Sequence, residues 1–174
     1  MPGAPILQAV FSERLVVGVG DLAVSNRENL TISTYALGSC VALVAYHPQR
    51  RAGGLIHLML PESRLSPDRA RKHPAVFADS GLALFFRELE GIGLRSKELR
   101  FFMGGGANVI NQGNDLFRIG ERNVAATKAF LQGRGLRAHL SSTGGFSNRT
   151  VHLELATGVL TIKMPEGQKK TILQ

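Results

Sequence analysis

The sequence predicts a single α+β domain of layered, mixed or antiparallel β-sheets, with two or three helices packed outside. Short apolar runs rich in β-branched residues and bounded by turn residues recur along the chain, and this pattern is typical of strands. Two longer segments, residues 75–92 and 122–132, place apolar residues at helical spacing. The 174 residues are enough for one domain with its own core. Strands that outnumber the helices favour an α+β fold.

The first third of the chain is expected to form strands. Residues 22–24 are predicted to continue the strand expected at residues 15–19 beyond a bulge. The strands expected at residues 41–46 and 54–60 are separated by a polar segment containing proline, which predicts that they form an antiparallel hairpin. Residues 1–12 are expected to be a loose terminus. The strands are expected at residues 15–19, 30–36, 41–46 and 54–60.

The remainder begins with residues 61–74, a proline-containing stretch whose basic part runs from residue 64 to residue 74. It is predicted to be irregular, either shaping a site or forming an exposed loop. His152 and Glu154 share one face of a late strand and are expected to form a half-exposed surface. Residues 165–174 are expected to be a loose tail. Further strands are predicted at residues 99–103, 136–140, 150–155 and 159–164.

The predicted hairpin carries the single cysteine, Cys40, and a histidine, His57. If Tyr46 pairs with Gly53, then His57 lies opposite Ala42, and Cys40 is its diagonal neighbour on the same face. Diagonal neighbours are roughly 7–8 Å apart, within reach of a long or aromatic side chain. A one-residue change of register would place the pair on opposite faces. The proximity of thiol and imidazole is therefore a hypothesis about register.

A thiol beside an imidazole can act as a nucleophile. An imidazolium or converging backbone N–H groups would lower the pKa of Cys40 from about 8.5. The turn formed by Gly38, Ser39 and Cys40 could direct N–H groups at an oxyanion, with Gly38 supplying unusual backbone angles. The alternative is that Cys40 is a small buried apolar residue and His57 a hydrogen-bonded core histidine.

The composition argues against several classes of protein. One cysteine excludes an internal disulfide and a cysteine-based metal site, and it suits a reducing cytoplasm. The first residues do not resemble a secretion signal, and no apolar stretch is long enough to predict insertion into a membrane. The formal net charge is +8, which suits a solvated surface or an acidic protein partner. Scarce aromatic residues and the lack of a recognisable motif argue against nucleic acid as a partner.

The residues around Cys40 and His57 resemble a known family. Thr34 lies six residues before the cysteine, and His57 lies seventeen after it. Together with the glycine blocks they resemble the CheD family of chemoreceptor glutamine deamidases. The matching segments are Leu37-Gly38-Ser39-Cys40-Val41, Gly53-Gly54, Met59-Leu60-Pro61, Gly104-Gly105-Gly106-Ala107, Ile119-Gly120-Glu121-Arg122-Asn123-Val124 and Thr143-Gly144-Gly145.

The resemblance implies that Cys40 is the nucleophile, His57 the general base and acid, and Thr34 the residue that orients the imidazole. Gly38 and Ser39 would form the oxyanion turn. The implied substrates are cytoplasmic glutamines of methyl-accepting chemoreceptors, and a CheC-type phosphatase is the implied regulatory partner. The implied hydrolysis needs no metal or organic cofactor. Without the resemblance, nothing distinguishes Thr34 from other hydroxyl residues nearby.

Two other functions remain open at this point. The chain could be a different Cys–His acyl-transfer enzyme, such as a receptor methylesterase, a protease or a transglutaminase, because these share the same thiol chemistry. It could also be a docking module that binds receptors or a phosphatase through an inert cysteine. Thiol reactivity separates the second possibility from any enzyme.

Overall fold

The structure, a computed structural model, describes residues 12–109 and 118–174. In these ranges ten strands form two five-stranded sheets. The outer sheet has the order β1 (Glu13–Val16), β3 (Leu30–Leu37), β8 (Arg149–Glu154), β9 (Val159–Met164), β10 (Gly167–Ile172). The central sheet has the order β2 (Leu22–Ser25), β5 (Ala52–Leu58), β4 (Val41–His47), β6 (Arg100–Gly105), β7 (Leu140–Thr143). Each sheet contains one parallel pair, β1–β3 or β6–β7, and the other pairs are antiparallel. The predicted layered α+β fold is confirmed.

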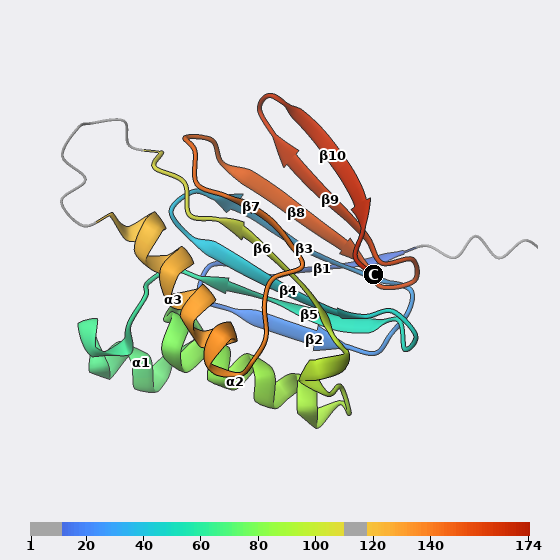
Figure 1. The fold of residues 1–174 in the computed structure, drawn as a ribbon, viewed down its shortest axis with the longest axis horizontal. Helices are drawn as coiled ribbons and strands as arrows, with labels where there is room; N and C mark the ends of the chain where they lie inside the picture. The colour runs from blue at the N-terminus through green and yellow to red at the C-terminus, as the bar shows by residue number, and fades with distance from the viewer. Residues whose placement is uncertain (1–11, 110–117) are drawn as a thin grey trace, which may run out of the picture.

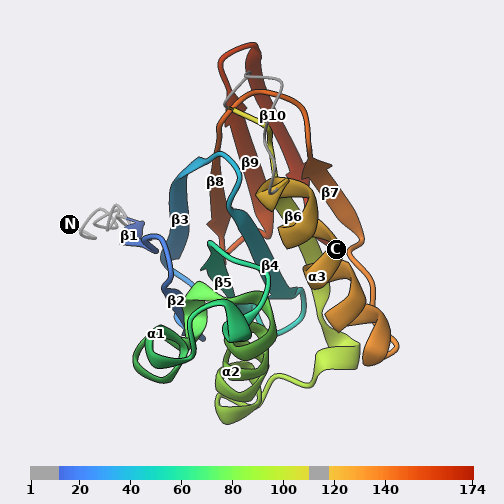
Figure 2. The same ribbon diagram turned by 90° about the vertical axis from the view of Figure 1, so that its left-hand side faces the viewer.

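The α-helices of the described residues are α1 (Pro67–Lys72), α2 (Ala78–Gly91) and α3 (Ile119–Gly133), and short 3-10 helices lie at Ser63–Leu65, Pro74–Val76 and Ser96–Glu98. Helices α2 and α3 lie on one face of the central sheet (Figures 1 and 2), and the outer sheet covers its other face. The layers therefore run helices, central sheet, outer sheet. Across residues 12–109 and 118–174, we find no helix with the length and apolar character of a membrane span.

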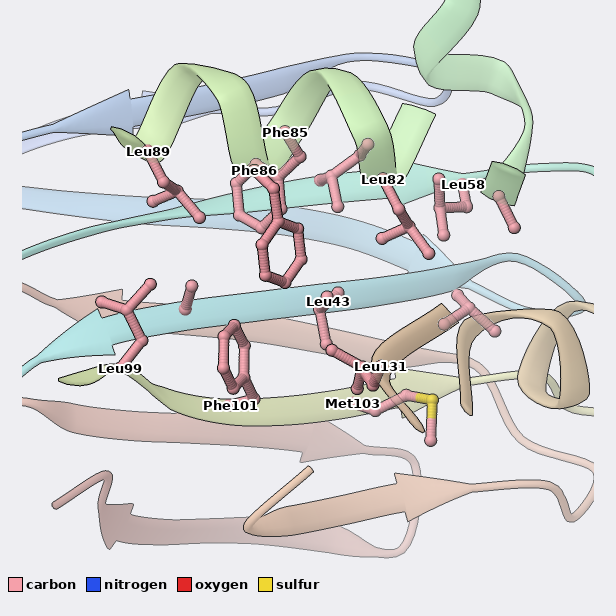
Figure 3. Packing of buried hydrophobic residues seen from close by; sticks show 14 of the residues in the cluster. Leu43, Leu58, Leu82, Phe85, Phe86, Leu89, Leu99, Phe101, Met103 and Leu131 are labelled. Carbon is pink, nitrogen blue, oxygen red and sulfur yellow. The ribbon is translucent and has the colours of Figure 1, made fainter. Parts of the chain in front are cut away.

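Strand β4 is buried on both faces because it lies in the middle of this stack. Val41, Leu43 and Ala45 belong to the cluster shared with the helices, and the alternate residues belong to the cluster between the sheets. Figure 3 shows Leu43 in the first cluster with residues of α2 such as Phe86. This two-sided burial explains the unbroken apolar run, since a strand with one wet face would alternate.

The β4–β5 hairpin has the predicted register, with Tyr46 opposite Gly53 and His57 opposite Ala42. The prediction for residues 22–24 is wrong, because β2 pairs with β5 in the central sheet rather than continuing β1. The intervening segment crosses between the sheets: the Val17 N–H donates to Ser33 O at 2.8 Å, and the Gly20 N–H donates to His57 O at 2.9 Å.

Two segments predicted to be irregular are ordered. Residues 61–74 contain α1, with Pro67 at its first turn, where a missing N–H costs nothing. The tail is not loose, because β10 pairs with β9 along its whole length. Leu173, just beyond β10, is buried in the cluster between the sheets. An edge strand rich in lysine has no apolar run to predict it. Residues 1–11 lie outside the described residues.

Candidate active site

A bulge in β3 brings the chain from the outer sheet toward the central sheet. Thr34 pairs with Val151, but Leu37 pairs with Arg149, so β3 contains one extra residue between these positions. Ala36, inside the bulge, has a left-handed φ of 55°. Thr34 and Leu37 are both buried as a result. The chain then passes through residues 38–40 and enters β4.

Gly38 is needed for space rather than for unusual angles. The left-handed residue of this region is Ala36, so the predicted reason for Gly38 is wrong. A Cβ at Gly38 would lie 2.9 Å from Asn148 Oδ1 and 2.9 Å from Val109 Cγ2, closer than side-chain carbons approach. The glycine lets the loops that contain Val109 and Asn148 close against the turn before Cys40.

Thr34 fixes the tautomer of His57. The Thr34 hydroxyl donates to the Val17 carbonyl at 2.7 Å, and the same oxygen lies 2.7 Å from His57 Nδ1. A hydroxyl has one proton, and a carbonyl only accepts. Thr34 therefore accepts from His57, which places the imidazole proton on Nδ1 and leaves a lone pair on Nε2. Both side chains are fully buried.

Cys40 directly precedes β4 and packs against the cluster between the sheets, which includes Ala42. Ala42 lies directly opposite His57, and alternation places residues 40 and 42 on the same face. His57 Nε2 is buried and has no hydrogen-bond partner among the described residues, the Cys40 thiol included. The free base nitrogen and the thiol thus occupy the same region between the sheets without a hydrogen bond between them.

Thiol and imidazole are both neutral at rest. Burial raises the pKa of Cys40, and its own backbone N–H opposes this only in part. Burial also lowers the pKa of His57 to about 4. The prediction of a lowered thiol pKa is therefore wrong, because the imidazole that would lower it is itself uncharged. Such a pair needs proton transfer from sulfur to nitrogen before attack.

The carbonyls of the turn are all held by donors from elsewhere. Gly38 O accepts from the Ala107 N–H at 2.8 Å, and Cys40 O accepts from the Gly106 N–H at 2.8 Å. A Cβ at Gly105 would lie 2.1 Å from Cys40 O, so the glycine block is required for this contact. The segment Gly104-Gly105-Gly106-Ala107 thus lies against residues 38–40.

Asn123 links the turn at residues 38–40, called the cysteine turn below, to the residue that follows β5, the strand that carries His57. Its Nδ2 donates to Ser39 O at 2.9 Å and to Met59 O at 3.0 Å. The side chain is fully buried. We did not single it out from the sequence, although a polar residue on the buried stripe of a helix was the available signal. The stripe consists of Gly120, Asn123, Thr127 and Leu131.

The amide of Ser39 has no protein acceptor within the described ranges. The Ser39 N–H belongs to the Gly38–Ser39 peptide, and this peptide is held in place because the Gly38 carbonyl accepts from the Ala107 N–H. In the same ranges no three His, Cys, Asp or Glu side chains gather as potential metal ligands. The arrangement offers a thiol, a neutral base and a free amide, which are the groups needed for acyl-transfer chemistry.

Comparison with known proteins agrees with the family resemblance seen in the sequence. A sequence model described as "CheD chemotactic sensory transduction" matches residues 59–164. Two relatives from Syntrophus aciditrophicus and Syntrophotalea carbinolica, named "Probable chemoreceptor glutamine deamidase CheD 1" and "Probable chemoreceptor glutamine deamidase CheD", are 37% and 39% identical. The alignments cover 88% and 87% of this chain and 95% and 94% of the relatives.

A third relative, "Probable chemoreceptor glutamine deamidase CheD 2" from Anaeromyxobacter dehalogenans, is 41% identical over 86% of this chain and 93% of its own. The family match begins after His57, but alignments this long must extend across residues 34–57. The chain belongs to the CheD family.

Proposed function

We propose that this protein hydrolyses glutamine side chains of chemoreceptors to glutamate, with Cys40 as nucleophile, His57 as base and acid, and Thr34 as the orienting residue. One observation carries the proposal: the Thr34 hydroxyl accepts from His57 Nδ1, which leaves the unpartnered Nε2 as a base beside Cys40. A structural histidine with full burial would satisfy both nitrogens.

The first half-reaction forms a thioester. A rotation of the Cys40 side chain brings its thiol to His57 Nε2, as catalytic hydrogen bonds often form only with substrate bound. The nitrogen takes the proton, and the sulfur attacks the carboxamide carbon. The oxyanion accepts from the Ser39 N–H, whose peptide is held through the Gly38 carbonyl by the Ala107 N–H. Collapse of the tetrahedral intermediate breaks the C–N bond, and His57 donates its proton to the departing ammonia.

The second half-reaction releases the product. Neutral His57 removes a proton from water, and the resulting hydroxide attacks the thioester carbonyl. The C–S bond breaks, and the proton on His57 returns to the sulfur. The net reaction consumes one water and yields glutamate and ammonia. Thr34 stabilises the transient imidazolium because its oxygen accepts from Nδ1–H throughout.

The relatives' names identify chemoreceptors as the proteins that carry the target glutamines. We place the reaction in the cytoplasm, because the family resemblance assigns the targets to the cytoplasmic parts of these receptors. The same resemblance leads us to propose a CheC-type phosphatase as a regulatory partner. Co-purification with such a phosphatase, and its effect on the deamidation rate, test this part separately.

The deamidase is tested by peptide mass mapping of a cytoplasmic chemoreceptor fragment after incubation with the enzyme. We expect a gain of about one mass unit at specific glutamines, lost with Cys40→Ala, as thiol catalysis requires. Wild-type enzyme with reduced Cys40 that leaves every glutamine unchanged would contradict the proposal. Slow alkylation of Cys40 in the same preparation would then favour the docking module.

The role of Thr34 is tested by a pair of variants. Thr34→Val keeps the shape but removes the hydroxyl, so His57 can adopt the other tautomer. We expect kcat to fall by about 10- to 100-fold, whereas Thr34→Ser retains most activity. Thermal unfolding of both variants separates this effect from simple loss of stability. Equal activity of the two variants would exclude the orienting role.

A further inference from the structure

The outer sheet has a second polar site on the face that points away from the central sheet. A hollow of about 560 Å³ lies over β1, β3, β8, β9 and β10. One row of paired residues runs along it, in which Ser33 faces His152, His152 faces Thr161, and Thr161 faces Lys170; all of these except the fully buried Ser33 line the hollow. Directly paired residues project from the same face of a sheet. The row therefore crosses four adjacent strands on one side.

The floor of this hollow is polar and hardly exposed. The relative exposures of His152 and Thr161 are 6% and 5%, and that of Thr31 is 7%. His152 Nδ1 lies 2.7 Å from the Ser33 hydroxyl, which anchors the ring. His152 Nε2 has no hydrogen-bond partner within residues 12–109 and 118–174. This nitrogen is not among the fully buried side-chain atoms without a partner, so it is open to solvent at the hollow and available to a polar ligand.

Positive charge dominates around the hollow. Arg14, Lys163 and Lys170 line it, and no carboxylate among the described residues lies within ion-pair distance of them. Of the two acidic residues in the lining, Glu28 is paired with Arg51 at 3.2 Å, which leaves Glu154 to oppose three cations.

The charged residues that act on the pKa of His152 are also mostly positive, in agreement with the excess of cations in the lining. Burial lowers its pKa, and the positive charges of Arg14 and Lys163 lower it further, while Glu154 acts in the other direction. The ring is therefore neutral and surrounded by a net positive field. A neutral imidazole can still donate or accept one hydrogen bond at Nε2.

We propose that this hollow binds a small multivalent anion carrying phosphate or carboxylate groups. The guanidinium of Arg14 matches the planar oxygens of either group, and Lys163 and Lys170 supply point charges from the opposite side. The Thr161 hydroxyl and His152 Nε2 provide uncharged hydrogen-bonding groups on the floor. The volume is in the range of roughly 300–1,000 Å³ typical of small-ligand pockets.

The site is distinct from Cys40 and His57. Ser33 and Thr34 are consecutive residues of β3, and their side chains lie on opposite faces of the outer sheet. Ser33 contacts His152, which lines the hollow, whereas Thr34 contacts His57 between the sheets. The ligand would therefore bind behind the candidate active site, and its binding does not depend on the proposed deamidation.

NMR titration of the full chain with sodium pyrophosphate and, separately, with citrate tests the proposal. The backbone amides of His152, Thr161 and Lys163 are followed, and a sodium chloride titration is matched in ionic strength. We expect the chemical shifts of these amides to change in a saturable way with pyrophosphate or citrate, and not with sodium chloride. Preference for one of these anions identifies phosphate or carboxylate as the recognised group.

Two variants of β10 provide a matched comparison. Lys170 lies over the hollow, whereas the adjacent Lys169 pairs with Ile162 on the other face, and each change to alanine removes the same charge. We expect Lys170→Ala to raise the dissociation constant at least about fivefold, as for loss of one charged contact, and Lys169→Ala to leave it nearly unchanged. Equal weakening by both, or linear shifts reproduced by sodium chloride, would overturn the proposal. Saturable binding of poly-glutamate but of neither small anion would also overturn it, in favour of an acidic protein partner.

Discussion

His57 should make the stability of the protein depend on pH. Its pKa is lowered to about 4 by burial, compared with about 6.5 in an unfolded chain. Between these values the unfolded state binds a proton that the folded state does not, so stability falls as pH falls. The cost is up to about 1.4 kcal/mol per pH unit.

The measurement is the free energy of unfolding by urea between pH 7 and pH 4, for the wild type and for His57→Gln. Because His139 and His152 also have lowered pKa values from burial, the difference between the two curves isolates His57. We expect the wild-type curve to be steeper in this interval. Parallel curves would show that His57 titrates normally.

Asn123 is the residue whose loss should separate positioning from folding. In Asn123→Ala, the carbonyls of Ser39 and Met59 lose their donor, at about 0.5–1.5 kcal/mol for each lost hydrogen bond. We expect kcat to fall at least about tenfold with KM little changed, because the Ser39–Cys40 peptide, which positions the proposed nucleophile, is no longer held.

Thr127→Val is the matched control for Asn123. Thr127 is also fully buried in α3, and its hydroxyl donates only to the Asn123 carbonyl at 2.8 Å. We expect its kcat to stay within about twofold of the wild type. An Asn123→Ala enzyme that is less stable but has normal kcat would limit Asn123 to a structural role.

At the scale of elements, the end of β6 is the most constrained part of the site. Gly105 has a φ of 107°, and a Cβ there would lie 2.1 Å from Cys40 O. Gly105→Ala must therefore displace β4 or the cysteine turn. We expect a loss of at least about 2 kcal/mol in stability and loss of most deamidase activity.

Gly133→Ala provides the contrast for Gly105→Ala. A Cβ at Gly133 meets no atom within 4 Å, and this residue ends α3. We expect this variant to be neutral or slightly stabilised, since alanine favours helix. Both variants are compared by thermal unfolding and by the deamidation rate, and similar behaviour of the two would contradict the argument.

The elements also show what a sequence can predict. The pairing of β4 with β5 was predictable because both strands are apolar and the break between them is short and polar, whereas their register was a hypothesis that the structure confirms. The sheet that β2 joins was not, because four residues carry no signal of which neighbour they pair with. The bulge at Ala36 escaped prediction because alanine does not favour a left-handed φ. Asn123 escaped because apolar spacing alone does not identify the buried stripe of α3, which contains the polar residues Asn123 and Thr127 beside Gly120 and Leu131.

At the scale of the whole molecule, the last ten residues are part of the fold. Removal of residues 165–174 deletes β10 and the buried Leu173. It leaves β9 as an edge strand that pairs only with β8. We expect the truncated protein to lose several kcal/mol of stability and to aggregate. Leu173→Ala alone should cost about 2–4 kcal/mol.

Removal of Gln174 alone is the control, because this residue lies beyond β10 and is exposed. The check is urea unfolding and size-exclusion chromatography of the three variants beside the wild type. A stable monomer lacking residues 165–174 would show that β10 contributes little to the fold.

The anchoring of the cysteine turn has a consequence for biosynthesis. Its three carbonyls are held by Gly106, Ala107 and Asn123, which leave the ribosome more than sixty residues after Cys40. Domains fold as units during synthesis, and contacts so distant in sequence form late. A nascent chain therefore carries its thiol and imidazole long before the turn at residues 38–40 is anchored, and we expect it to be inert toward glutamine until α3 has emerged and docked.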